Sequence, residues 1–444
     1  MERIGRNMEE LNLHHYLHNE LKCNCGKIHS TNLREIEISK GALEKLPKLI
    51  FKYKYEKICI ISDKNTYKAA GEKVIDILNA EQIENYSIVL REENLIPNEV
   101  ALGEVIVRIE PDCDLIIAVG SGTINDISKF ISYKLSIDYY VVATAPSMDG
   151  FASNVSALIT NQLKTTYETH VPIAIIGDIN ILTEAPMDMI IAGIGDILGK
   201  YVCLLDWKIA SIIQGEYHCT YIESMVQKSL NIIISNGEKV KDRDPQTIQY
   251  IMEGLVLSGI AMSYAGNSRP ASGSEHHLSH YWEMMFLFQG KEPVLHGIKV
   301  GIGTIVAINL YEKLLDSTID FKSAKARILD FNLEEWKKEI RKVYQIVWED
   351  IIKFEEETQK NSKEKVLGRL DILESNWEEI KETIREYLPS SKDLIKLMES
   401  IGAPVRPEQI GVSKEMLDNS IRYAKEIRNR YGLLQILFDL SLYE

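Results

Sequence analysis

A short apolar run that ends in a glycine turn limits most strongly what this chain can fold into. Residues Asp114–Val119 are apolar almost throughout, as expected of a strand covered on both faces. Gly120-Ser121-Gly122-Thr123 follows directly, and a helical pattern begins with Ile124-Asn125-Asp126. Strand, glycine turn and helix N-terminus form the geometry that binds a dinucleotide pyrophosphate, because backbone N–H groups point at the anion. The full Gly-x-Gly-x-x-Gly pattern is absent, so an ordinary tight turn remains an alternative.

Strands and helices alternate from Thr31 to about Leu182, which predicts βαβ units and a mostly parallel sheet. The other predicted strands are Glu35–Ile38, Lys57–Ser62, Tyr86–Leu90, Tyr139–Thr144 and Pro172–Ile176, and the helices between them include Ala69–Asn79 and Asn98–Ile109. Strand signals become rare after Leu182. Helices are predicted at Met187–Ile213, Glu223–Asn236, Pro245–Ala265, His277–Phe288, Val300–Leu315, in two or more pieces over Leu333–Leu388, and at Ser413–Leu442. We therefore expect an α/β nucleotide-binding domain with a lead-in segment over residues 1–182, and an α-helical domain over residues 183–444.

Composition narrows the class of protein. The 444 residues carry a formal net charge of −14, which argues against nucleic acid or an anionic membrane as the main partner. The six cysteines are scattered, so a reducing cytoplasm is the simpler interpretation. The first residues lack the apolar core of a signal peptide, and no apolar run reaches the ~20 residues of a spanning helix. We expect no membrane insertion and a cytoplasmic location.

Histidines gather in one stretch of the predicted helical domain. His276 and His280 are four residues apart, which on a helix places both rings on one face. The preceding residues 268–273 should interrupt any helix, so a new helix can start near Ser274. His296 follows later, and Asp196 lies upstream in a glycine-rich helical stretch. One carboxylate and two imidazoles form a common catalytic metal set, although a pair of histidines on a helix is more often solvated or simply core.

A second cysteine and histidine group lies near the N-terminus. Cys23-Asn24-Cys25 with His29 nearby could suggest zinc. The spacing lacks the second ligand pair of a structural finger, so the sequence favours a surface lead-in segment instead.

Two further features place polar side chains after predicted strands, where open α/β sheets bind ligands. Asp63 ends one strand and could accept hydrogen bonds from a cofactor ribose, or could cap the next helix. The stretch Thr144-Ala145-Pro146-Ser147-Met148-Asp149-Gly150 follows another strand, and its alternative is a capped junction between a loop and a helix.

Taken together, these motifs resemble one family. Gly120–Asp126, Thr144–Gly150, Gly195-Asp196, the Ser272–His280 stretch and His296-Gly297 occur in the order seen in sn-glycerol-1-phosphate dehydrogenases, and Arg428-Asn429-Arg430-Tyr431 resembles the bacterial branch associated with arabinose utilisation. That family belongs with the iron-dependent alcohol dehydrogenases and the dehydroquinate synthases. The resemblance implies a Rossmann-like nucleotide-binding domain followed by an all-α domain.

The resemblance also implies roles for individual residues. Asp196, His276 and His296 match the metal ligands, whereas Asp149, Asp196 and His280 match substrate contacts. The residues that match NAD(P) contacts are Asp63, Gly120, Ser121, Gly122, Thr123, Ile124, Asn125, Asp126, Thr144, Ala145, Pro146, Ser147 and Ser153. His277 should face about 100° away from His276 on a helix and should not bind the same ion. Nickel and zinc both suit these ligands.

The implied activity is NAD(P)H-linked reduction of dihydroxyacetone phosphate to sn-glycerol 1-phosphate by a homodimer. Arg269 and Lys200 are the local candidates for binding the substrate phosphate. The alternatives are a polyol dehydrogenase without a phosphate requirement, a dehydroquinate-synthase-like lyase and a non-catalytic binder. The lyases generally have Glu where Asp196 stands, and intact ligands argue against loss of activity.

Overall fold

The computed structural model describes residues 11–17, 20–161 and 163–443. Part of the predicted lead-in, residues 1–10 with positions 18 and 19, lies outside the described residues. Contacts divide the chain into two compact units. Among the described residues, the first contains those up to Ile197 together with Thr220–Ser268, and the second contains Leu198–Cys219 and those from Arg269 onward. The predicted domain division after Leu182 stays a prediction.

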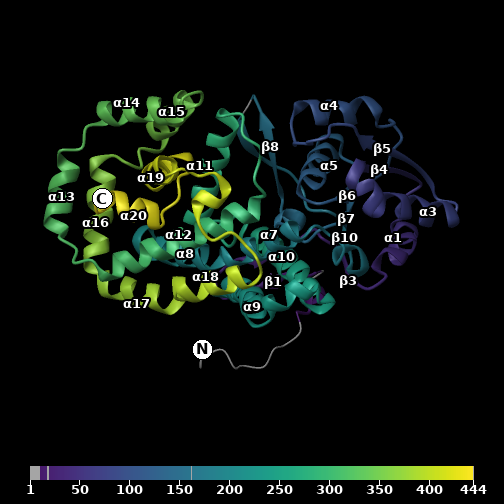
Figure 1. Cartoon of the computed structure of the whole chain (residues 1–444), viewed down its shortest axis with the longest axis horizontal. Helices are drawn as coiled ribbons and strands as arrows, with labels where there is room; N and C mark the ends of the chain where they lie inside the picture. Colours follow the sequence, from purple (N-terminus) through teal and green to yellow (C-terminus); the bar gives the residue numbers. More distant parts are fainter. Residues whose placement is uncertain (1–10, 18–19, 162, 444) are drawn as a thin grey trace. The chain divides into compact units, whose positions relative to one another are not determined.

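The first unit is built on a six-stranded parallel sheet of order β3-β10-β7-β6-β4-β5 (Figure 1). Its strands, in that order, are Glu35–Ser39, Ala174–Asp178, Asp138–Ala143, Leu115–Gly120, Lys57–Asp63 and Glu84–Leu90. Its helices are α1 (Leu46–Tyr53), α2 (Lys64–Thr66), α3 (Glu72–Ala80), α4 (Glu99–Arg108), α5 (Gly122–Leu135), α6 (Ile179–Leu182), α7 (Met187–Leu198), α9 (Thr220–Asn236) and α10 (Pro245–Ala265). Short helical turns lie at Leu13–Tyr16, Ala42–Lys45, Tyr67–Gly71, Gly150–Ala152 and Gly237–Asp242.

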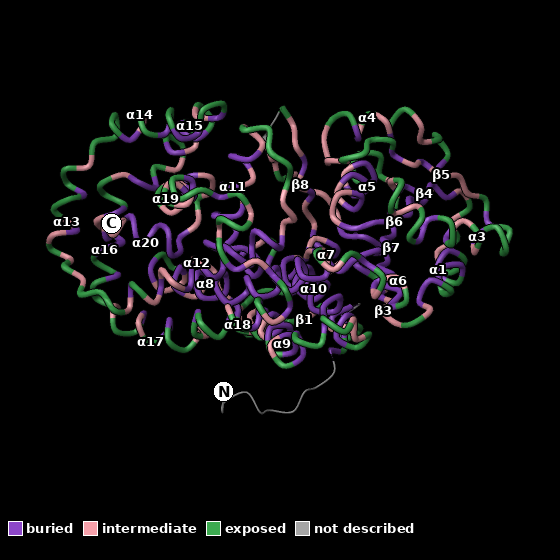
Figure 2. The backbone as a smooth tube through the Cα atoms, in the orientation of Figure 1, coloured by how far each residue is buried: buried purple, intermediate pink, exposed green. Residues whose placement is uncertain are grey.

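The core of this unit follows the alternation of side chains along the strands. Ile58 and Ile60 of β4, with Leu115 and Ile117 of β6, belong to one buried cluster that also holds the apolar sides of α1 and α3. Figure 2 shows the central strands buried along their length, and all six residues of β6 are buried. A strand this apolar fits only inside a sheet that is covered on both faces.

The first unit also contains two small ribbons that are separate from the six-stranded sheet. β1 (Leu21–Lys22) pairs antiparallel with β2 (Ile28–His29), and β8 (Val155–Thr160) pairs antiparallel with β9 (Leu163–Glu168). Neither ribbon was predicted from the sequence. The second could have been found, because half of the residues in Val155–Thr160 and in Leu163–Glu168 are β-branched or aromatic, and the turn lies near Asn161, whose φ is 51°.

The second unit is helical in its described residues. Its helices are α8 (Lys200–Gln214), α11 (Ser274–Phe288), α12 (His296–Asp316), α13 (Phe321–Leu329), α14 (Leu333–Tyr344), α15 (Trp348–Thr358), α16 (Lys363–Ser375), α17 (Trp377–Tyr387), α18 (Ser391–Ser400), α19 (Lys414–Tyr423) and α20 (Leu433–Asp439), with short turns at Pro407–Ile410 and Ala424–Ile427. The predicted fold class, a parallel α/β region followed by a largely helical region, is confirmed. The single helix predicted over Met187–Ile213 is wrong, since it divides at Gly199 into α7 and α8. Glycine is the least favourable ordinary residue inside a helix.

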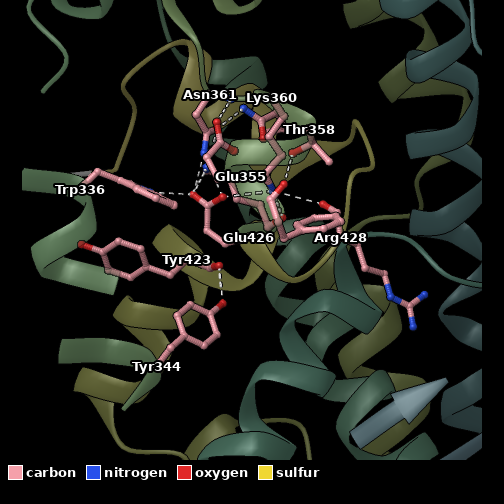
Figure 3. A network of polar contacts seen from close by, with 12 residues as sticks. Trp336, Tyr344, Glu355, Thr358, Lys360, Asn361, Tyr423, Glu426 and Arg428 are labelled. Carbon is pink, nitrogen blue, oxygen red and sulfur yellow. Dashed lines mark hydrogen bonds and ion pairs between the residues drawn. The ribbon is translucent and has the colours of Figure 1, made fainter. Parts of the chain in front are cut away.

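A buried polar network ties distant segments of the second unit together (Figure 3). Glu426 accepts hydrogen bonds from Trp336 Nε1 (3.1 Å) and Asn361 Nδ2 (3.0 Å), and Lys360 Nζ lies 3.1 Å from its carboxylate. Lys425 forms a further ion pair with Glu426. Burial opposes ionisation here, but the two lysines hold the pKa of Glu426 at about 2. The carboxylate therefore neutralises cations that burial would otherwise exclude.

None of the helices in the described residues has the length and apolar character needed to span a membrane.

Candidate active site

The sheet of the first unit reverses its strand order between β4 and β6. From β4 the chain moves outward to β5, and from β6 it moves outward in the other direction to β7 and β10. Ile61 of β4 is paired with Ala118 of β6, so Asp63 and Gly120, each two residues further, end at the same level. Ligands of open α/β sheets bind at such a reversal, beyond the carboxyl ends of the strands.

The N-terminus of α5 lies at this reversal. A Cβ atom on Gly120 would lie 2.6 Å from Cβ of Ile124, so a side chain is excluded there. Gly122, the first residue of α5, has more room, because its Cβ would lie 3.4 Å from Cγ of Met148. Ser121 precedes the helix without capping it through its side chain. The first N–H groups of α5 are thus available in a setting that suits a phosphate group.

The second predicted loop meets the first one directly. Thr144 N–H donates to the carbonyl of Gly120 (3.1 Å), and the hydroxyls of Ser121 and Ser147 form a short hydrogen bond. Asn125 Nδ2 donates to the carbonyl of Gly150 (3.2 Å), so its amide braces the second loop from α5. Ala145 and Pro146 lie between these contacts, while Thr123 is partly exposed on the first turn of the helix.

Lys129 is the strongest tie between α5 and the second loop. Its Nζ donates to the carbonyls of Gly150 (2.7 Å) and Val155 (2.9 Å) and lies 3.1 Å from Oγ of Ser153. Burial lowers the pKa of Lys129 to about 8, and burial raises the pKa of Asp126 to about 6. Ser153, predicted as a cofactor contact, already makes three hydrogen bonds in this arrangement, so its structural role is to fix the loop.

Two helices support the second loop from behind. Gly193 of α7 leaves no room for a side chain against the carbonyl oxygen of Pro146, and a Cβ on Gly259 of α10 would lie 2.8 Å from Cβ of Ala152. Asp149 N–H donates to Oδ2 of Asp196 (2.9 Å). Ser258 also donates to Oδ2 of Asp149 (2.8 Å). Both aspartates are buried, and the loop is seated by close backbone contact.

Asp63 caps the helix that follows β4. Its Oδ1 accepts from the N–H groups of Asn65 (2.7 Å) and Thr66 (2.8 Å), and Thr66 completes a capping box. Asp63 therefore caps the helix, which is one of the two roles that its sequence position allows. Because both bonds end on Oδ1, Oδ2 stays outside the cap, and the predicted contact with a cofactor ribose remains a prediction.

The helix that carries the first two site histidines starts at Ser274, as the sequence predicts. Buried Asp206 of α8 receives hydrogen bonds from Ser274 N–H (2.7 Å) and Oγ (2.6 Å) and from Tyr311 (2.5 Å) and Leu433 N–H (3.0 Å). A Cβ on Gly273 would lie 2.7 Å from Cα of Cys203, so α11 begins directly against α8. Asp206 therefore joins the starts of α11 and α20 to α12.

The site histidines of the second unit lie close together. The ring centroid of His276 is 6.1 Å from that of His280 and 5.1 Å from that of His296, and the last two are 5.9 Å apart. Nδ1 of His276 lies 2.6 Å from Oε1 of buried Glu275. A carboxylate on one ring nitrogen fixes the tautomer and leaves Nε2 for an ion.

Asp196, His276 and His296 form one of the groups whose donor atoms could hold a metal ion, and these atoms all lie within 4.8 Å of one another. His277 is not part of this group. Burial, followed by the nearby cations Arg428 and Arg430, lowers the pKa of His277 well below its ordinary value. Metal binding itself stays a prediction.

Arg269 and Lys200, the two residues predicted to bind the substrate phosphate, both contact other residues of the second unit. Arg269 forms a two-bond ion pair with Glu216 and also donates to the carbonyl of Tyr431 (2.9 Å). Lys200 donates to the carbonyl of Ala271 (3.1 Å). Figure 3 shows the side chain of Arg428 extending away from the network around Glu426, and burial lowers the pKa of Arg428.

Sequence reasoning missed the residues that hold the predicted ones in place. Glu275 is adjacent to His276, and neighbours on a helix do not normally face each other, so spacing gave no signal. Lys129 and Asp206 lie in helices that carry other charged residues as well, so the sequence alone favours an exposed position for both. The signal available for both was a charged residue on the face that periodicity assigns to the core.

Comparisons with known proteins were made for the whole chain. A family model described as iron-containing alcohol dehydrogenase matches residues 37–186. A glycerol-1-phosphate dehydrogenase [NAD(P)+] from Geobacillus thermodenitrificans is 33% identical over 418 residues, which cover 93% of this chain and 94% of that protein. The one from Geobacillus stearothermophilus is 32% identical over 95% of this chain and 97% of that protein. Among solved structures, an archaeal halo-thermophilic alcohol dehydrogenase from a Red Sea brine pool superposes with a TM-score of 0.62 at 14% identity, covering 95% of this chain and all (100%) of that one.

Proposed function

This chain belongs to the iron-containing alcohol dehydrogenase family, and we propose that within it the chain reduces dihydroxyacetone phosphate to sn-glycerol 1-phosphate. Family membership makes it an NAD(P)-dependent oxidoreductase, similar to glycerol-1-phosphate dehydrogenases over most of its length. The observation that carries the proposal is the group of Asp196, His276 and His296, whose donor atoms lie within 4.8 Å of one another. We expect a cytoplasmic homodimer.

The donor set fits a divalent transition ion, since a carboxylate and two imidazoles suit nickel and zinc. When bound there, such an ion would polarise the ketone carbonyl as a Lewis acid. Glu275 would keep His276 turned with Nε2 toward the ion. His280 is partly exposed, so it can hold a proton for the substrate oxygen and exchange it with solvent.

The first unit would hold the nicotinamide cofactor, which supplies the hydride when bound. The backbone of Gly120–Thr123 and the N-terminus of α5 would bind the pyrophosphate. Oδ2 of Asp63 would accept a hydrogen bond from a ribose hydroxyl. The loop Thr144–Ser147 would line the same site, because it is hydrogen-bonded to the first loop.

Arg428 is our revised candidate for the substrate phosphate. Arg269 and Lys200 already have contacts within the second unit, whereas no described residue forms an ion pair with the guanidinium of Arg428. A guanidinium binds phosphate oxygens through two parallel N–H groups. Arg428 is also one of the cations that keep His277 uncharged, so it lies near the helix of the site histidines.

Substrate choice tests the proposal. Purified protein loaded with nickel or zinc should oxidise NADH or NADPH rapidly with dihydroxyacetone phosphate and slowly with dihydroxyacetone. Equal rates would refute the phosphate requirement and favour the polyol dehydrogenase. Net consumption of reduced cofactor also separates this activity from a lyase that recycles its NAD.

Single variants test the roles of the histidines. His276→Ala should lose activity and bind one metal ion fewer per chain than the wild type, whereas His15→Ala, at an exposed position, should change neither. A His276→Ala protein with the same metal content as the wild type would show that the ligand set is wrong.

A further inference from the structure

A second group of metal-binding side chains lies in the described part of the chain, apart from the candidate active site. Cys23, Cys25, His29 and Cys219 each offer one donor atom, and the four atoms lie within 4.8 Å of one another. A surface segment was predicted here, because the spacing of Cys23, Cys25 and His29 lacks the second ligand pair of a structural zinc finger. That expectation is wrong for His29, which is fully buried, and Cys219 supplies the fourth donor.

The ribbon that carries three of these side chains has the shape of a metal-binding turn. Cys23 N–H donates to the carbonyl of Lys27 (3.0 Å), and Gly26 N–H donates to the carbonyl of Cys23 (3.0 Å). Gly26 has a φ of 86°, which favours glycine, and a side chain there would be strained. The tight turn brings the thiols of Cys23 and Cys25 close to His29, which lies on the second strand of the ribbon.

The ring of His29 is already fixed in the orientation that a metal ligand requires. Its Nδ1 lies 3.0 Å from the carbonyl oxygen of Tyr264, and the two rings stack with centroids 5.5 Å apart. A carbonyl only accepts, so Nδ1 carries the proton and Nε2 has the lone pair. Nε2 lies 3.3 Å from Sγ of Cys25, so both donors address the same point. Such support of the second ring nitrogen accompanies metal-bound histidines.

The fourth donor comes from the start of α9. Cys219 is buried and directly precedes Thr220, the first residue of that helix. α9 packs along α10, and Tyr264, which holds His29, lies near the end of α10. Chain connectivity and these contacts therefore bring Cys219 to the ribbon.

We propose that Cys23, Cys25, His29 and Cys219 bind one structural zinc ion. Three thiolates and one imidazole are a common tetrahedral zinc set, and Zn–S bonds of ~2.3 Å place the sulfur atoms about 3.8 Å apart. The observed separations need only a small closure to reach this. On binding, the three thiols release their protons to solvent and His29 binds as the neutral ring.

The ion would serve the ribbon's stability. Each strand of the β1–β2 ribbon has only two residues, and isolated two-stranded ribbons are marginally stable in water. A metal that links this ribbon to α9 would supply folding free energy to a ribbon that has only two residues in each strand. The ion takes no part in the proposed reaction, and its presence does not depend on that proposal.

Cobalt substitution in the full-length reduced protein tests the site. Cobalt held by thiolates gives intense sulfur-to-metal absorption, whereas cobalt held by Asp196, His276 and His296 gives none. We expect this absorption in the wild type and in His276→Ala, and one zinc per chain by elemental analysis in His276→Ala, which lacks the active-site ion. The absorption should be lost in the Cys25→Ser/Cys219→Ser double variant and kept in Cys113→Ser, which removes a buried thiol outside the group.

Three outcomes would overturn the proposal. The first is a wild-type protein without thiolate-to-cobalt absorption, which decides the question even if the double variant does not fold. The second is unchanged absorption in the double variant. The third is a disulfide between two cysteines of the group, identified by peptide mapping of the zinc-free protein under non-reducing conditions. Loss of dehydrogenase activity with the absorption intact would instead count against the proposed function alone.

Discussion

Asp206 shows how burial changes the behaviour of a single carboxylate. It receives hydrogen bonds from the starts of two helices and from Tyr311, yet burial still raises its pKa to about 6. A raised pKa in the folded state means that folding takes up a proton between about pH 4 and pH 6. The stability contributed by the protonated group is fully present below the unfolded pKa and is lost as pH rises through about 6.

We therefore expect the Asp206→Asn variant to differ from the wild type in a pH-dependent way. The advantage of the wild type in free energy of unfolding should be largest near pH 4 and should fall by up to about 3 kcal/mol as pH rises past 6. Urea unfolding followed by tryptophan fluorescence at several pH values measures this. A difference that stays constant with pH would show that Asp206 does not titrate in this range.

The N-terminus of α5 is the element on which cofactor binding depends. Gly122 can accept a methyl group without a clash, because the nearest atom would be 3.4 Å away. The backbone there must nevertheless approach a phosphate closely if the proposed cofactor site is correct.

Gly122→Ala should therefore separate binding from stability. We expect the Kd for NADH to rise about tenfold, a loss of about 1.4 kcal/mol, while thermal stability stays the same or increases. Gly103→Ala is the matched control, since Gly103 lies exposed inside α4 with nothing within 4 Å of an added Cβ. It should gain about 0.5–1 kcal/mol of stability and bind NADH normally. An unchanged Kd for NADH in Gly122→Ala would show that the cofactor phosphate does not bind at the N-terminus of α5.

At this same scale, the sequence predicted some elements better than others. β6 and the start of α5 were readable, since an uninterrupted apolar run and a glycine turn leave few alternatives. The start of α11 at Ser274 followed from the break before it. The division at Gly199 and the β8–β9 ribbon were not predicted, because local pattern competes there with contacts made by distant residues. The assignment of Asp196 as a ligand together with His276 and His296 came from a family resemblance, because spacing does not bring Asp196 to histidines that lie 80 and 100 positions further along the chain.

For the molecule as a whole, buried charges decide how cooperatively the second unit holds together. Glu426 connects Trp336 of α14, Asn361 and Lys360 before α16, and Lys425 beside it. The group of charges is stable only when it is complete, since removal of the carboxylate leaves two buried lysines without a counter-charge.

Glu426→Gln should lower the free energy of unfolding by about 3–5 kcal/mol at neutral pH. Glu356→Gln removes a carboxylate from an ion pair with Lys337 at the surface and should cost less than about 1 kcal/mol. Denaturant unfolding of both variants beside the wild type gives the comparison. Equal losses in the two variants would mean that the buried carboxylate neutralises nothing.

The hydrogen bonds from Lys129 to three oxygen atoms of the second loop should affect how fast a nucleotide binds. Because these contacts already order the second loop, a nucleotide that binds there does not have to order it. The entropic cost of ordering the loop is therefore not part of the free energy of binding. Capture should then proceed in one kinetic phase, at a rate set by diffusional encounter and not by rearrangement of the binding surface.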